Sequence, residues 1–392
     1  MSHPWNRAVL AAALALWVMG MPGGAAAADL RLNQFELKLG VIVPLTGAVP
    51  DFGQFIREGV LLAVQEWNAR GGVLGQKITT IVEDGQCAPG PATAAAHKLV
   101  ETDGVHFIIG EVCSKASIPV SEITNTARVI QVSPTSTNPR VTVDPTGAVK
   151  RFTFRDCFID PFQGIVGARF AYGNLKARTA FVMTDSANDY VSGLASMFTT
   201  EFTRLGGTIV GTADYDGGRK TDFSTELSQV RTAAPDVVYL PDYYNVVNLV
   251  ARQARAGGMA VPFIGGDGWD SQDLDARAAE GSYFTNHFSD DDPRPEVATF
   301  LEAFDAAYPG GNYSTSRHML AALAYDAVNL VFTAIQDAGT DDTTQVGKAL
   351  EAIHFHGVTG DLTFDQAHNP QKSAYVFAVK GGAVRFAARV DP

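Results

Sequence analysis

The sequence has no block of basic residues, and charged residues make up only 18% of its 392 positions. Its 30 Lys and Arg are outnumbered by 42 Asp and Glu, which gives a formal net charge of −12. Nucleic acids and anionic membranes attract clustered Lys and Arg, so neither is expected as a main partner. Hydrophobic residues reach 46%, which excludes a disordered chain. The length suits two domains.

Signatures of nucleotide, metal and enzyme chemistry are also missing. No Gly-x-Gly-x-x-Gly leads from a strand into a helix and no Walker A sequence occurs, so no nucleotide site is expected. His354 and His356 place two imidazoles on one strand face without an evident third ligand. Cys113 lies between a strand and a helix, as a nucleophile does, but no His is placed to serve as its base. We therefore expect no cofactor, no metal, no catalytic residue and no enzyme.

The N-terminus, residues 1–28, has the pattern of a secretory signal peptide. Arg7 precedes an uncharged apolar run, and small residues ending at Ala28 form a cleavage site. The run is too short for a bilayer, which takes about 20 residues. We expect cleavage near Ala28 and export to the periplasm. No later stretch is expected to be long and apolar enough to span a membrane.

Cysteine is scarce, with three in the whole chain. Export makes a disulfide possible. Cys87 and Cys113 each follow an expected strand, and two adjacent parallel strands would bring the loops after them together. We therefore expect a Cys87–Cys113 disulfide and a free, buried Cys157; the alternative is three reduced buried thiols.

What is abundant is an alternation of strand and helix patterns, which predicts parallel sheets with helices on both faces. The alternation runs to about residue 132 and then restarts, so two α/β lobes of similar size are expected. The last two expected strands are joined by Lys380-Gly-Gly382, a hairpin signal. Expected strands are 37–43, 77–82, 106–110, 129–132, 152–155, 179–184, 208–215, 237–240, 262–265, 374–379 and 383–388.

The expected helices and the tail complete this fold class. The tail after the second lobe is too small for a third domain and must pack back onto the two lobes, so the chain is expected to cross between them more than once. Expected helices are 52–69, 91–101, 116–126, 162–173, 190–205, 223–233, 246–256, 296–307, 317–338 and 344–353. The domain boundaries are a signal peptide at 1–28, lobe one at 36–156 plus 288–358, and lobe two at 157–287 plus 359–392.

The loops after the strands are the expected ligand site, because ligands of open α/β sheets lie beyond the carboxyl ends of the strands. In lobe one these loops offer hydroxyls and helix N-termini, which are donors suited to a carboxylate. In lobe two they offer Asp267 with Tyr190, Tyr243 and Trp269, an acid among aromatics that suits an ammonium group. Together they predict a small zwitterion such as an α-amino acid. Taken singly, each feature has an alternative interpretation: the hydroxyls as helix caps, Asp267 as a turn residue and the tyrosines as surface aromatics.

Four segments then carry a resemblance to a known family. Residues 37–47, the Trp-Asn-Ala-Arg-Gly-Gly-Val-Leu-Gly segment at 67–75, the loop 83–87 and the Ile-Gly-Glu-Val-Cys-Ser segment at 109–114 resemble the leucine/isoleucine/valine-binding protein family. These proteins are periplasmic substrate-binding components of ABC transporters with the type I periplasmic-binding fold, in which several strands form a hinge between the lobes. The resemblance covers essentially all of residues 36–390.

The resemblance implies roles for individual residues. Ser114 and Thr137 are expected to bind the ligand carboxylate, the Thr135 carbonyl to accept from the ammonium, and Asp267 to pair with it. Phe52 stands where a branched-chain binder has Tyr, and Asp267 where it has Glu. The Cys87–Cys113 pair matches the family disulfide. The full set of predicted ligand-binding residues is Phe52, Ser114, Thr135, Ser136, Thr137, Tyr190, Tyr243, Asp267 and Trp269.

The implied function is a monomeric solute-binding protein of an ABC importer. It would bind a branched-chain or other aliphatic amino acid between its lobes and deliver it to a membrane permease. Two alternatives remain open: the same fold used as a sensor, and a different ligand such as an amide, a urea or an aromatic acid.

Overall fold

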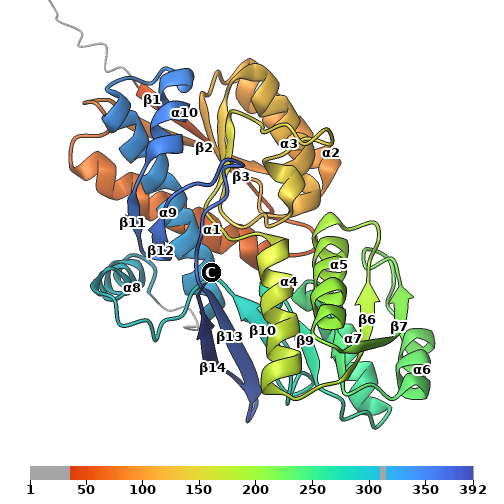
Figure 1. Ribbon diagram of the computed structural model, residues 1–392. Helices are drawn as coiled ribbons and strands as arrows, with labels where there is room; N and C mark the ends of the chain where they lie inside the picture. The colour runs from red at the N-terminus through yellow and green to blue at the C-terminus, as the bar shows by residue number, and fades with distance from the viewer. Residues whose placement is uncertain (1–35, 310–314, 392) are drawn as a thin grey trace, which may run out of the picture. The chain divides into compact units, whose positions relative to one another are not determined.

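Five parallel strands form the sheet of the first lobe, in the order β2-β1-β3-β4-β5 (Figure 1). The computed structural model describes residues 36–309 and 315–391, so the expected signal peptide lies outside the described residues. Every residue of β3 and β4 is buried, as in a sheet covered on both faces. The strands are β1 (Glu36–Val43), β2 (Lys77–Asp84), β3 (Phe107–Gly110), β4 (Ile130–Ser133) and β5 (Thr153–Arg155).

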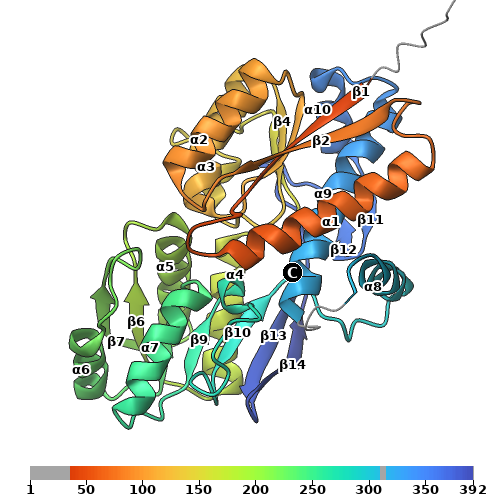
Figure 2. The ribbon, with the colours of Figure 1, turned by 180° about the vertical axis from the view of Figure 1, so that it is seen from behind.

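Helices from both ends of the chain cover this sheet. The long helix α1 packs along α9, and α2 packs against α3 (Figure 2). At Gly59 of α1, an added Cβ would lie 2.1 Å from the backbone oxygen of Ala321, so the absence of a side chain sets how closely α1 approaches α9. The helices are α1 (Pro50–Ala69), α2 (Pro89–His97), α3 (Ser114–Ala127), α9 (Thr315–Ala338) and α10 (Thr343–Ala352).

Helix α9 corrects one expectation. Its segment Ser316–Ala338 is long and apolar enough to cross a membrane by length and composition, although no such stretch was expected after the N-terminus. Most of this segment is buried inside the protein, where it packs against α1 and α10. Its apolar character is therefore that of a core helix.

The second lobe contains a seven-stranded sheet in the order β14-β13-β10-β9-β8-β6-β7. Five of these strands are parallel, but β13 pairs antiparallel with β10 and with β14. The strands β13 and β14 form the C-terminal hairpin that the Lys380-Gly-Gly382 signal predicts, and this hairpin lies at the edge of the sheet. The strands are β6 (Thr179–Thr184), β7 (Thr208–Asp214), β8 (Val237–Tyr239), β9 (Phe263–Gly265), β10 (Tyr283–Asn286), β13 (Ala374–Lys380) and β14 (Ala383–Val390). Its helices are α4 (Asp160–Arg169), α5 (Asp189–Arg204), α6 (Ser224–Ala233) and α7 (Tyr244–Ala256).

Three connections link the two sheets. The chain leaves the first sheet after β5, returns after β10 through α8 (Pro295–Ala307) to α9, and crosses again before β13. A small sheet of β11 (Phe355–Gly357) and β12 (Gly360–Leu362) precedes the third connection. The predicted fold class, two α/β lobes with repeated crossings, is confirmed.

The expected disulfide is present, and Cys157 is free and buried. The Cα atoms of Cys87 and Cys113 are 5.3 Å apart. The reason for their proximity differs from the expected one, because β2 and β3 are not neighbours: β1 lies between them. The disulfide therefore joins loops that flank the carboxyl end of β1.

Candidate functional site

A pocket between the lobes gathers six of the nine predicted ligand-binding residues. Phe52, Ser114 and Thr135 come from the first lobe, and they meet side chains from loops at strand ends of the second lobe. Three apolar residues that were not predicted complete the lining. The lining consists of Phe52, Val112, Ser114, Thr135, Tyr190, Tyr243, Asp267, Met319 and Leu320.

Asp267 is the acid of this pocket and lies in the short 3-10 turn η4 (Asp267–Trp269) after β9. Its Oδ1 accepts hydrogen bonds from Gln163 Nε2 (2.8 Å) and Tyr190 OH (2.9 Å). Its Oδ2 lies 3.2 Å from His287 Nε2. Burial raises the pKa of Asp267, but the His287, Gln163 and Tyr190 contacts outweigh it and hold the pKa below its ordinary value. Asp267 is therefore a carboxylate at neutral pH.

Sequence reasoning missed Gln163 and His287. His287 is 1% exposed, and its ring lies on Phe158 with centroids 3.6 Å apart. It follows β10, a strand absent from the expected set, so the loop after it was not considered. The signal was present in Tyr283-Phe-Thr-Asn286, which is rich in β-formers. Gln163 projects from α4, where nothing in the helical pattern distinguishes it.

The aromatic side chains form one wall of the pocket. The rings of Tyr190 and Tyr243 stack with centroids 5.0 Å apart, and Phe52 meets Tyr243 edge-on at 6.2 Å. Tyr190 OH also accepts from the backbone N–H of Gly268 at 2.9 Å. The tyrosines are thus fixed by packing and hydrogen bonds rather than lying at the surface.

The lobe-one side is built around the start of α3. Ser114 is the first residue of α3, and its Oγ accepts from the backbone N–H of Asn138 at 3.2 Å. The first N–H groups of a helix have no partner within the helix, so this end attracts anions. Thr135 Oγ1 donates to the Val112 carbonyl at 2.9 Å.

Three predicted residues do not line the pocket. Ser136 is buried, and its Oγ is 2.6 Å from Ser117 Oγ. Thr137 is fully buried, and its carbonyl accepts from the Asp160 N–H at 3.0 Å. Trp269 is fully buried in the second lobe, where its Nε1 donates to the Leu240 carbonyl at 2.8 Å.

The free space between the lining residues is small, about 10 Å³, on the order of one water molecule. Contacts between the lobes close the pocket. Asn138 Nδ2 donates to the Asp189 carbonyl at 2.7 Å, and Arg140 Nη1 lies 2.9 Å from Asp189 Oδ1. A ligand the size of an amino acid therefore enters only if the lobes separate or lining side chains move.

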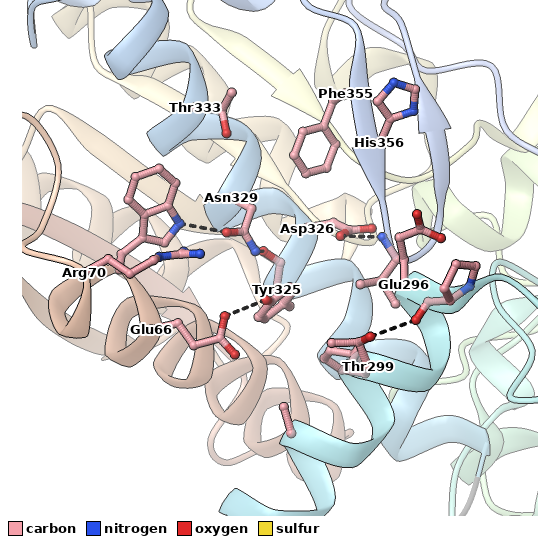
Figure 3. A pocket seen from close by; sticks show the side chains of 15 residues that line it. Glu66, Arg70, Glu296, Thr299, Tyr325, Asp326, Asn329, Thr333, Phe355 and His356 are labelled. Carbon is pink, nitrogen blue, oxygen red and sulfur yellow. Dashed lines mark hydrogen bonds between the residues drawn. The ribbon is translucent and has the colours of Figure 1, made fainter.

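A larger cavity of about 590 Å³ lies elsewhere, between α1, α8, α9 and β11 (Figure 3). Four of its side chains are bonded in two pairs: Tyr325 OH donates to Glu66 at 2.6 Å, and Trp67 Nε1 donates to Asn329 at 2.7 Å. Polar groups that are already paired do not converge on a ligand. Its size alone does not make it the functional site.

Two α/β lobes whose strand ends meet at a pocket with both polar and apolar lining define the class of two-lobed ligand-binding proteins. The sequence profile of the family described as periplasmic binding protein matches residues 36–383. The chain belongs to this family and is a solute-binding protein of the ABC-transporter kind, not an enzyme. The resemblance predicted from the sequence is therefore confirmed.

Individual relatives agree. The leucine-, isoleucine-, valine-, threonine- and alanine-binding protein of Pseudomonas aeruginosa is 30% identical over 337 residues, 84% of this chain and 86% of the relative. A leucine-binding protein (LivK) of Thermotoga maritima has a TM-score of 0.83 at 33% identity, covering 91% of this chain and 99% of that one. The isoleucine complex of LivJ from Streptococcus pneumoniae has a TM-score of 0.82 at 29% identity, covering 91% of this chain and 100% of that one.

The same fold occurs with a different ligand. A solute-binding protein from R. palustris in complex with benzoate has a TM-score of 0.79 at 22% identity, covering 91% of this chain and 97% of that one. At this identity the likeness concerns the fold alone.

Proposed function

We propose that the protein binds an aliphatic α-amino acid between its lobes and delivers it to an ABC permease. The observation that carries the proposal is the ionised Asp267 in the pocket wall. Contacts with three side chains hold its pKa below the ordinary value. A carboxylate has about four lone-pair positions, so one remains for a ligand ammonium. A buried acid of this kind favours a cation and opposes a ligand that is only an anion.

The other parts of a zwitterion have matching partners. The N-terminus of α3 with Ser114 would bind the ligand carboxylate, and the Thr135 carbonyl would accept from the ammonium beside Asp267. Val112, Met319 and Leu320 are apolar lining residues, which suit an aliphatic side chain. The names of the relatives, which include leucine and isoleucine binders, support the same ligand class.

Transport and location form the rest of the proposal. The family supports export to the periplasm and delivery of the ligand to a membrane permease. Removal of residues 1–28 is proposed from the signal-peptide pattern of the sequence, and the protein is proposed to act as a monomer. The small free space in the pocket supports binding by hinge motion, with the lobes open before the ligand enters and closed around it.

The test is the variant Asp267→Asn, which removes the charge and keeps the shape. After unfolding and refolding to remove bound ligand, calorimetry with the twenty amino acids identifies the ligand. Asp267→Asn should then bind it at least about thirtyfold more weakly, or ~2 kcal/mol, because the ammonium loses its counter-charge. Asp214→Asn, an exposed acid of the second lobe, is the control and should bind normally. Wild-type affinity in Asp267→Asn, or binding of benzoate in place of amino acids, would refute the proposal.

A further inference from the structure

One buried cluster joins the lobes immediately beside the pocket. Asp51, in the first turn of α1, accepts from Tyr244 OH on Oδ1 and from Ser271 Oγ on Oδ2, each at 2.6 Å. Asp51 belongs to the first lobe, whereas Tyr244 begins α7 and Ser271 follows η4 in the second. Their exposed fractions are 7%, 6% and 7%.

Sequence neighbours connect this cluster to the pocket. Phe52 and Tyr243 line the pocket, and each is adjacent in sequence to one member of the cluster. Phe52 also contacts Tyr244, with ring centroids 5.6 Å apart. None of the three cluster residues lines the pocket. The cluster and the pocket must therefore form and separate together.

We propose that Asp51, Tyr244 and Ser271 are an interlobe latch, a set of positioning residues that fix ligand affinity without touching the ligand. The proposal rests on the proposed function, since it requires that ligand be held between closed lobes. In the closed arrangement, Asp51 is only 7% exposed, and the two hydroxyls replace most of the water around its carboxylate. In an open arrangement, water would solvate the same carboxylate.

Because water can replace a hydroxyl only in the open state, loss of a hydroxyl destabilises the closed state more than the open state. If Tyr244 OH is removed, the Asp51 carboxylate stays buried with one of its two side-chain donors missing, which is expensive for a charged acceptor. The open state loses nothing comparable, because water remains available. The population of closed protein falls, and apparent affinity falls with it in proportion.

The test uses Tyr244→Phe, which removes one oxygen and keeps the ring that packs on Phe52. Affinity for the ligand should fall about tenfold, the lower end for a hydrogen bond to a charged group. The dissociation rate should rise by about the same factor while the association rate changes little, because ligand enters the open form. Stopped-flow fluorescence with the best amino acid of the panel separates the two rates.

A matched control exists within one lobe. Tyr325 OH donates to Glu66 at 2.6 Å, the same distance and chemistry, but α9 and α1 both belong to the first lobe. Tyr325→Phe should leave affinity and both rates unchanged. Ser271→Ala is the second latch variant and should also raise the dissociation rate, which keeps the test valid if Tyr244→Phe folds poorly.

The latch variants and Asp267→Asn test the two proposals separately. Wild-type dissociation rates in both latch variants, or an equal change in Tyr325→Phe, would overturn the latch even if Asp267→Asn abolishes binding. If Asp267→Asn binds normally, the ammonium assignment fails, whatever the latch variants show.

Discussion

At the scale of single residues, burial raises the pKa of every acid near the pocket, but the contacts of each acid decide the net shift. It raises the pKa of Glu111 to about 7, of Asp160 to about 8 and of Asp242 to about 6. Asp267 is also buried, yet its pKa is lowered because His287, Gln163 and Tyr190 contact its carboxylate. Asp267, the acid in contact with the pocket, is therefore ionised at neutral pH.

Asp160 gives a prediction about stability and pH. It is fully buried at the start of α4, and its pKa is raised to about 8. The folded state thus keeps a proton that the unfolded chain releases near pH 4, so the stabilising contribution is complete below that pH and is lost as the pH rises to about 8. In Asp160→Asn this loss should be absent. The free energy of unfolding should then fall less steeply between pH 5 and 7, by up to about 1.4 kcal/mol per pH unit.

Urea unfolding at several pH values measures this slope. Asp214→Asn is the control, because Asp214 is exposed and its pKa is lowered, so it is ionised in both states across this range. Equal slopes in wild type and Asp160→Asn would show that Asp160 is ionised in the folded protein.

At the scale of elements, the strand and helix patterns predicted most of the fold, because buried parallel strands and helix ends have strong local signals. Side-chain direction had no such signal. Trp269 follows a strand of the second lobe as predicted, but η4 turns it back over Gly265, where an added Cβ would lie 2.0 Å from the indole Nε1. His287 was missed because β10 was missed, and Gln163 because a helix position does not reveal which polar residue faces a distant loop. Contacts between distant segments decide such details.

The contact of α1 with α9 gives the prediction for elements. Gly59→Ala would place a methyl group 2.1 Å from the Ala321 carbonyl oxygen, so the helices must move apart. Overpacking of this kind costs about 1–3 kcal/mol of unfolding free energy, more than the gain in helix propensity. Gly90→Ala in α2 is the matched control, since nothing lies within 4 Å of its added Cβ and it should be neutral or slightly stabilising. Thermal unfolding of both variants gives their midpoint temperatures. Equal midpoints would show that α9 can move away from α1 without loss of stability.

At the scale of the whole molecule, a buried ionic cluster ties the connections between the lobes. Lys372 Nζ, on the third connection, lies 2.6 Å from Asp156 Oδ1 on the first and donates to Thr359 Oγ1 at 2.6 Å. Thr359 in turn donates to Asp326 of α9. Burial raises the pKa of both carboxyls, and Lys372 opposes this shift in each. One cation thus stabilises two buried acids where the chain crosses between the sheets.

Lys372→Met tests how much the lobes depend on this cluster. The variant keeps the unbranched apolar part of the side chain but leaves Asp156 and Asp326 without their cation, and breaking a buried pair costs about 3–5 kcal/mol. The double variant Lys372→Met/Asp156→Asn removes one of the stranded acids and should recover part of the loss, because the two sites are coupled. Urea unfolding at pH 7 measures both variants against wild type. Purely additive losses would mean that Lys372 and Asp156 stabilise the protein independently, and that the crossing segments are held by packing rather than by charge.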